Sequence, residues 1–161
     1  MDKFLSNRIN TLAESETLAM MRMSRELMAK GHDVISLAVG EPDFNTPENI
    51  KDAAILAIND NFTHYTPVSG IPELRQAICR KLKRDNGLEY APENIVVSTG
   101  AKQSLYNTML CLVNPGDEVI VPCPYWVSYK EIIKMAEGKA DYLEAGINQD
   151  FKITASQLEK A

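Results

Sequence analysis

Between residues 95 and 143 the sequence alternates short apolar runs with longer amphipathic runs. The apolar runs at 95–97, 118–121 and 139–143 predict strands, and the amphipathic runs at 101–113 and 125–137 predict the helices between them. Alternation of strands and helices with short turns is typical of an α/β layer built on a largely parallel sheet. The sequence therefore predicts an α/β fold with a largely parallel sheet and flanking helices.

The first turn of this series has the sequence Ser-Thr-Gly-Ala-Lys at residues 98–102. The N-terminus of a helix offers backbone N–H groups without internal partners and the positive end of the helix dipole, so it can bind a phosphate. Gly100 lets an anion come close to the backbone, and Ser98, Thr99 and Lys102 can add hydroxyl donors or charge. In parallel sheets, ligands bind beyond the carboxyl ends of the strands, where this turn lies. The turn is a candidate phosphate site; the alternative is a helix start that binds nothing.

Upstream of residue 95 the sequence predicts three more helices and one more strand. Residues 16–30 predict a helix that stops at Gly31, and residues 34–39 predict a strand that leads into the turn at Gly40. A second helix begins with Thr46 as N-cap and Pro47 at its first position, and a third spans about 72–86. We expect the apolar faces of the first two helices to be buried. They consist of Leu18, Met21, Met23, Leu27 and Met28, and of Ile50, Ala53, Ala54, Ala57 and Ile58.

Composition excludes several classes of function. A net charge of −5 argues against nucleic-acid binding, which usually requires a basic patch. No apolar run approaches the length of a membrane span, and residues 1–4 lack the layout of a signal peptide, so we expect a cytoplasmic protein without a membrane partner. His32 and His64 lie far apart and have no metal-ligand spacing, so no metal site is predicted. Three scattered cysteines predict reduced thiols.

Four further segments flank the turn at residues 98–102. Residues 37–44 (LAVGEPDF) and 65–75 (YTPVSGIPELR) precede it, and residues 114–119 (NPGDEV) and 124–129 (PYWVSY) follow it. Together these segments resemble the N-terminal part of the class I aminotransferases, the pyridoxal 5'-phosphate (PLP) enzymes of the aspartate aminotransferase group, and in particular the bacterial aspartate aminotransferase subgroup. The resemblance extends from about Leu5 to Leu158.

The resemblance implies the N-terminal part of the PLP-dependent transferase fold type I, incomplete in this chain. Residues 1–45 would form an N-terminal arm and part of the small domain, and residues 46–161 would form the first part of the large PLP-binding domain. The chains of the family are considerably longer, and they carry the Schiff-base lysine, the aspartate under the pyridine nitrogen and the carboxylate-binding arginine after the part that matches this sequence. We therefore expect an inactive N-terminal portion without a catalytic residue, with exposed apolar surface and a tendency to self-associate.

The resemblance also implies how the cofactor is held. Gly100, Ala101 and Lys102 would bind the phosphate of PLP through backbone N–H groups and a side-chain donor, and the indole of Trp126 would stack on the pyridine ring. Lys102 would not be the Schiff-base lysine, because a lysine beside a phosphate stays protonated and is a poor nucleophile. The structural alternatives are a helix start that binds nothing and a core or interface tryptophan.

Two further residues would complete the site. The hydroxyl of Tyr65 would reach the phosphate of the partner subunit's cofactor, which implies a homodimer. The backbone at Gly40 would approach the α-carboxylate of the substrate, which the N–H of Trp126 can also reach. The alternatives are a buried ring on a loop for Tyr65 and a turn glycine for Gly40. For Glu41 and Asp43 a solvated turn is predicted, because nothing in the sequence makes them face each other.

The activity implied by the resemblance is transfer of an amino group from an amino acid, aspartate first, to a 2-oxo acid such as 2-oxoglutarate. Aromatic amino acids, prephenate, alanine and kynurenine remain open as substrates, because the arginines that discriminate among them lie outside the matched part. A non-catalytic module that binds a phosphate ligand or a partner protein is the alternative from another class. The isomer of the Cys123–Pro124 peptide, often cis in the family, is also left open.

Overall fold

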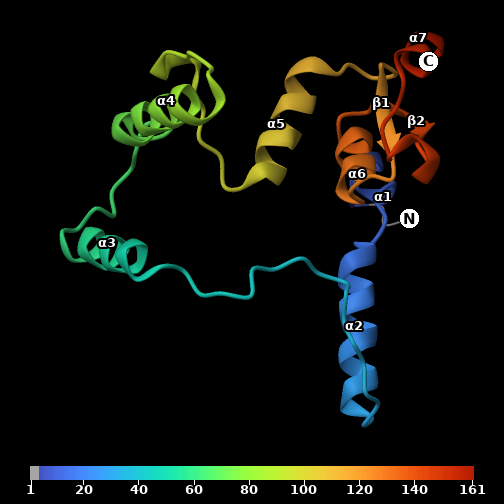
Figure 1. Ribbon diagram of the computed structural model, residues 1–161, viewed down its shortest axis with the longest axis horizontal. Helices are drawn as coiled ribbons and strands as arrows, with labels where there is room; N and C mark the ends of the chain where they lie inside the picture. Colours follow the sequence, from blue (N-terminus) through green and yellow to red (C-terminus); the bar gives the residue numbers. More distant parts are fainter. Residues whose placement is uncertain (1–3) are drawn as a thin grey trace. The chain divides into compact units, whose positions relative to one another are not determined.

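The computed structural model describes residues 4–161, which divide into two units (Figure 1). The first unit combines residues 4–39 with residues 101–161, and the second comprises Gly40–Gly100.

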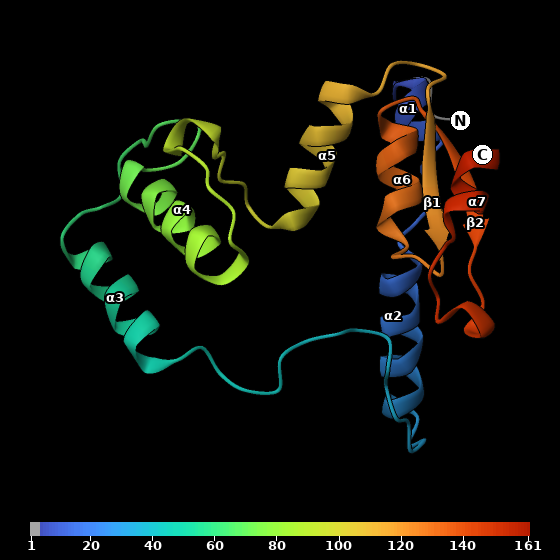
Figure 2. The same cartoon turned by 45° about the horizontal axis from the view of Figure 1, so that its top comes forward.

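The core of the first unit is a strand–helix–strand arrangement. Strand β1 (Glu118–Cys123) pairs in parallel with β2 (Lys139–Glu144), and helix α6 (Ser128–Met135) connects them and packs on β2 (Figure 2). Buried apolar side chains come from both layers: Val121, Ile132, Ile133, Ala136 and Ala145. The two predicted strands and their parallel pairing are confirmed.

Helix α5 (Ala101–Leu112) begins directly after Gly100, as predicted, and packs on α6. Gly100 has a φ of +82°, a conformation that glycine adopts without the steric cost that other residues pay. Helix α6 starts at Ser128 rather than at 125, so the predicted start was wrong. Residues 124–127 turn the chain from the end of β1 onto the face of the sheet, and the first bond of that turn runs from the N–H of Tyr129 to the carbonyl of Trp126 (3.0 Å). The Cys123–Pro124 peptide is cis.

The remaining helices of the first unit come from the N-terminal and the C-terminal parts of the chain. Helix α1 (Asn7–Asn10) contacts α6, and α2 (Glu16–Ala29) begins at Ser15, whose hydroxyl accepts the N–H of Leu18 (3.4 Å). In the C-terminal part of the chain, η2 (Ile147–Gln149) and α7 (Ala155–Lys160) follow β2. The side chain of Gln157 ties α7 to β2 by donating to the carbonyl of Glu144 (2.9 Å).

Two predictions for the N-terminal part were wrong. Residues 34–39 form no strand, because no strand of residues 4–161 lies alongside to hydrogen bond with them. The apolar face predicted for α2 is not buried, since most of its side chains are exposed: Leu18, Met23, Leu27 and Met28. No helix or strand within the described part of the chain covers that face.

The second unit contains α3 (Glu48–Asn59), α4 (Pro72–Asn86) and the short η1 (Pro92–Asn94). Helix α4 ends as predicted, at a glycine (Gly87) with a left-handed φ of +67°. The guanidinium of Arg75 on α4 donates to the carbonyl of Pro92 through Nε (2.8 Å) and also through a terminal nitrogen. This contact holds η1 against α4.

Three details predicted for the second unit were wrong. Residues 95–97 are not part of a sheet, although Ile95 is extended and the N–H of Val97 donates to the carbonyl of Ser69 (3.0 Å). A strand needs a neighbouring strand, and the sheet of residues 4–161 contains only β1 and β2. Thr46 does not cap α3, which starts after Pro47 without a side-chain cap. Along α3, Ile50, Ala53, Ala54 and Ile58 are exposed rather than buried.

Large apolar side chains are exposed in both units, as expected for this chain. They include Leu37, Phe44, Ile58 and Phe62, together with the helix faces described above. Self-association of the chain remains a prediction.

Replacing Gly138 with Ala is expected to destabilise the first unit by about 1–3 kcal/mol, because a Cβ there would overpack the core. That Cβ would lie 2.7 Å from Cγ1 of Val113, 3.2 Å from the carbonyl oxygen of Asp117 and 3.3 Å from Cγ2 of Ile133. Gly146→Ala is the matched control, since nothing lies within 4 Å of a Cβ there. The measurement is urea unfolding followed by circular dichroism, and equal stability of the two variants would contradict the packing described here.

Candidate functional site

The residues that the sequence analysis singled out are divided between the two units. The first unit holds Ala101, Lys102 and Trp126, and the second holds Gly40, Tyr65 and Gly100.

The turn that leads into α5 depends on the conformation of Gly100. A Cβ at Gly100 would meet nothing within 4 Å, so the glycine is needed for its positive φ and the space beside it is open. The N–H of Gly100 itself donates to the carbonyl of Ser98 (2.9 Å). Within residues 4–161, the N–H groups of Ala101 and Lys102 donate to no backbone carbonyl. The first turn of this twelve-residue helix therefore offers two backbone donors to an anion.

The structure brings Lys102 and Trp126 together. The ammonium of Lys102 lies 4.9 Å from the centre of the Trp126 ring, within the range of a cation–π interaction. The ring of Tyr129 meets the indole edge-on, with centroids 5.6 Å apart and planes at 90°. Trp126 is 43% exposed. The indole is thus a partly open, flat apolar surface beside a cation and the N-terminus of α5.

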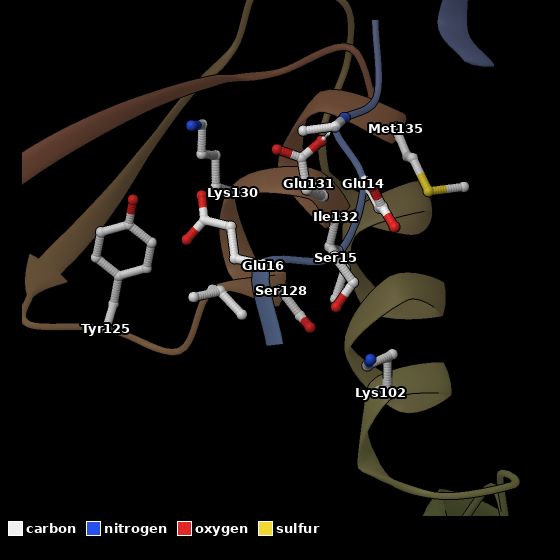
Figure 3. A pocket seen from close by; sticks show the side chains of 12 residues that line it. Glu14, Ser15, Glu16, Lys102, Tyr125, Ser128, Lys130, Glu131, Ile132 and Met135 are labelled. Carbon is white, nitrogen blue, oxygen red and sulfur yellow. Dashed lines mark hydrogen bonds between the residues drawn. The ribbon is translucent and has the colours of Figure 1, made fainter. Parts of the chain in front are cut away.

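A cleft of about 270 Å³ lies next to this pair in the first unit (Figure 3). One side comes from the segment between α1 and α2, and the other from α6, the residues before it and α5. Its lining residues are Ala13, Glu14, Ser15, Glu16, Lys102, Tyr125, Val127, Ser128, Lys130, Glu131, Ile132 and Met135. The lining combines acidic side chains (Glu14, Glu16 and Glu131), basic side chains (Lys102 and Lys130) and apolar ones, so the cleft presents charges of both signs.

Sequence reasoning missed the side of the cleft that residues 13–16 form. The only signal there was Ser15 before an apolar-periodic run, a typical N-cap position. That signal locates the start of α2 but does not indicate what the segment contacts.

Glu131 connects residues 13–16 to α6 by a hydrogen bond. One carboxylate oxygen accepts the backbone N–H of Ala13 (3.2 Å), and the other accepts a hydrogen bond from the ammonium of Lys134 (3.0 Å). Partial burial of Glu131 acts to raise its pKa. The hydrogen bonds from Lys134 and Ala13, with the charge of Lys130, outweigh that effect and hold the pKa of Glu131 below its ordinary value.

The stability that Glu131 contributes should therefore disappear in acid. A carboxyl group with a lowered pKa in the folded state stabilises the fold above its unfolded pKa, and the stabilisation is lost as the pH falls through the folded value. We expect the difference in unfolding free energy between wild type and Glu131→Gln to be constant near neutrality and to shrink below about pH 4.3. Urea unfolding at a series of pH values measures it; a difference that does not change with pH would show that the charge of Glu131 is not involved.

Tyr125 connects the cleft to the sheet. Its ring stacks on that of Tyr142 on β2, with centroids 5.2 Å apart and planes at 24°. Burial, together with the hydrogen bond and proximity of Tyr125, raises the pKa of Tyr142 to about 12, so this phenol stays neutral at physiological pH. This stacked pair links the lining of the cleft to β2.

In the second unit, Tyr65 and Gly40 are open to solvent. Tyr65 is fully exposed and lines a hollow of about 300 Å³ whose walls come from residues 61–73. Nothing lies within 4 Å of a Cβ at Gly40, so the described residues alone do not require a glycine there. Glu41 and Asp43 are exposed, in agreement with a solvated turn. The roles expected of Tyr65 and Gly40 remain predictions.

Within residues 4–161, no three histidine, cysteine or carboxylate side chains are placed to bind a metal together. No helix of that part of the chain is long and apolar enough to cross a membrane.

Comparison with known families and sequences gives a consistent result. The family model for aminotransferases of class I and II matches residues 32–161. An aspartate aminotransferase from Bacillus sp. (strain YM-2) is 53% identical over all 161 residues, which cover 41% of that protein. A probable aspartate/prephenate aminotransferase from Rhizobium leguminosarum is 52% identical over 98% of this chain and 40% of its own length.

Solved structures of aspartate aminotransferases are also similar to this chain. The aspartate aminotransferase of Rhizobium meliloti superposes with a TM-score of 0.91 at 44% identity, over 97% of this chain and 39% of that one. The aspartate aminotransferase of Thermus thermophilus with maleate superposes with a TM-score of 0.93 at 41% identity, over 99% of this chain and 42% of that one. The chain thus spans about 40% of the length of the relatives it matches.

Proposed function

This chain belongs to the class I and II aminotransferases, and from that premise we propose that it is the N-terminal part of an enzyme that transfers an amino group from aspartate to a 2-oxo acid such as 2-oxoglutarate. The observation that carries the proposal is the 53% identity, over all 161 residues, to a protein named aspartate aminotransferase. The identity extends over every helix and strand of the chain. A shared reaction explains it better than a shared fold with a different reaction.

The residues present fit the cofactor that the family implies, PLP. A phosphate needs fixed donors, and the N–H groups of Ala101 and Lys102 are available at the start of α5. A flat heteroaromatic ring needs a flat wall, and Trp126 offers a partly open indole held edge-on by Tyr129. When bound, PLP supplies an electron-withdrawing ring that stabilises negative charge at the Cα of the amino acid. We propose that Gly100, Ala101 and Lys102 bind the phosphate and that Trp126 supports the ring.

This part of the chain would contribute positioning and electrostatics rather than the catalytic base. An ammonium group beside a phosphate donates hydrogen bonds to it, so Lys102 would stabilise the anion rather than act as the base. The indole of Trp126 excludes water from one face of the cofactor, and its N–H can donate to a substrate carboxylate. The backbone at Gly40 would approach the α-carboxylate of the same substrate.

We further propose a cytoplasmic homodimer in which Tyr65 donates to the phosphate in the partner subunit. Full exposure of Tyr65 on an open loop supports a role outside its own unit. Residues 1–45 would belong to the arm and small domain of the complete enzyme, and residues 46–161 to its large domain.

Prephenate is the second candidate substrate. Relatives at 52% identity carry names that include both aspartate and prephenate. An aspartate/prephenate aminotransferase is therefore nearly as well supported as one that acts on aspartate alone.

The test uses the complete protein, purified with PLP and supplied with aspartate and 2-oxoglutarate. Formation of oxaloacetate and glutamate supports the proposal, and prephenate in place of 2-oxoglutarate tests the second candidate. The 161-residue chain is the matched control and should form neither product. If the complete protein transferred amino groups from none of aspartate, aromatic amino acids, alanine or kynurenine, the proposed function would be wrong.

A further inference from the structure

The linker between α1 and α2 (residues 11–15) has an unusual attachment. The linker is bonded to α6, although α6 lies more than a hundred residues further along the chain. The backbone N–H of Ala13 donates to the carboxylate of Glu131 (3.2 Å; Figure 3). The distance in sequence is 118 residues, so this bond fixes one part of the fold to another. Thr11 bonds locally, since its hydroxyl (2.8 Å) and its N–H (3.3 Å) both donate to the carbonyl of Arg8.

The attachment at Ala13 determines where the cleft lining lies. Glu14, Ser15 and Glu16 follow immediately and line the cleft opposite α6 and Lys102. Ser15 is engaged as the N-cap of α2, so the chain from Ala13 into the helix has little freedom. A shift at Ala13 would therefore move this lining and the start of α2 together.

The side chain of Glu131 is oriented to accept the N–H of Ala13. Its side chain is only 24% exposed, and its second oxygen is bonded to Lys134 one turn along α6. The carboxylate is thus oriented from its own helix before it accepts the N–H of Ala13. Helix α1 contacts α6, and its Arg8 pairs with Glu137, just beyond the end of α6 (3.4 Å), through side chains that are 45% and 49% exposed. Exposed ion pairs contribute little to stability, and within residues 4–161 the bond from Ala13 to Glu131 is the one hydrogen bond between residues 11–15 and α6.

We propose that Glu131 is a positioning residue of the substrate cleft, which sets the position of residues 13–16 relative to Lys102 by accepting the N–H of Ala13. This inference rests on the proposed function for its effect on catalysis, but not for the contact itself. Because the hydrogen bonds of Glu131 in the described part of the chain go to Ala13 and Lys134 and not to Lys102 or Trp126, its loss should alter substrate binding and leave cofactor binding nearly unchanged.

Three variants separate the contributions of Glu131. Glu131→Ala removes both hydrogen bonds. Glu131→Gln removes the charge but keeps an oxygen that can accept the N–H of Ala13. Lys134→Met removes the ion pair and leaves the bond to Ala13 in place. If Glu131 acts through Ala13, only the alanine variant should be strongly impaired, and the glutamine variant should restore function.

The experiment has two readouts. Hydrogen exchange at the Ala13 amide, measured on the complete protein, should become roughly ten- to a hundredfold faster in Glu131→Ala and stay near wild type in the other two variants. In the complete enzyme, the KM for aspartate should rise by a similar factor in Glu131→Ala, with kcat and PLP affinity nearly unchanged. Unchanged exchange at Ala13 in Glu131→Ala, or a glutamine variant as impaired as the alanine variant, would overturn the inference. A wild-type enzyme without amino-transfer activity would contradict the proposed function alone, since exchange at Ala13 would still decide whether Glu131 holds the linker.

Discussion

Replacing Lys102 with Ala in the complete enzyme is expected to weaken PLP binding roughly ten- to a hundredfold, because a charge-assisted hydrogen bond to phosphate contributes about 1.5–3 kcal/mol. Lys102 combines a charged side chain with a backbone N–H at the start of α5, and its ammonium lies 4.9 Å from the Trp126 ring. The alanine variant removes the charge and keeps the backbone donor, so binding should weaken without being abolished. Equilibrium titration of the apoenzyme with PLP measures the change.

Lys130→Ala is the matched control for this prediction. Lys130 lines the same cleft from α6 but makes no cation–π contact with Trp126 in the described structure. Its replacement should change PLP affinity by less than about threefold. Equal weakening by the two substitutions would show that the general charge of the cleft, rather than the start of α5, binds the cofactor. Trp126→Ala should also weaken binding, and Trp126→Phe should recover part of the loss because it keeps a flat ring.

Replacing Ile133 with Ala should be the most destabilising single substitution in the first unit, at about 2–5 kcal/mol. Ile133 is 1% exposed and lies on the face of α6 that packs on the sheet. Its truncation removes apolar contacts and leaves a cavity that the two strands cannot close. Urea unfolding followed by circular dichroism measures the loss.

Ile147→Ala provides the comparison, because Ile147 is 77% exposed in η2 of the same unit. Its replacement should change the unfolding free energy by no more than about 0.5 kcal/mol. If both variants lost the same stability, the core would not lie between α6 and the β1–β2 sheet.

The part of the fold that the sequence predicted well is the part whose signals are local. The apolar runs of β1 and β2, the amphipathic pattern of α6 and the glycine before α5 lie within a few residues of the structures they specify. The glycine at the end of α4 is a signal of the same kind. Such signals depend on backbone conformation and on side-chain periodicity, both of which can be read from one sequence.

The predictions that were wrong depended on what lies alongside a segment. Residues 34–39 and 95–97 have the composition of strands, but a strand forms only beside another strand, and none of the described chain pairs with them. The periodicity of α2 and α3 shows which face is apolar without showing what covers it. Both faces are largely exposed, because the described residues supply no layer above them.

Only part of the candidate site could be predicted, because only part of it carries local sequence signals. The turn before α5 and the segment around Trp126 each carry a recognisable motif, and the structure adds that Lys102 lies against the indole. The linker side of the cleft carries no motif, because its key contact is a backbone N–H at Ala13, and every residue except proline has one. A main-chain contact over 118 residues of sequence leaves no pattern that one sequence can reveal.

The most direct test of the proposed site is a crystal structure of the complete protein with PLP. The phosphate should lie at the N–H groups of Ala101 and Lys102, with the pyridine ring against the indole of Trp126. A phosphate bound elsewhere, or a ring with no contact to Trp126, would contradict the assignment of this site.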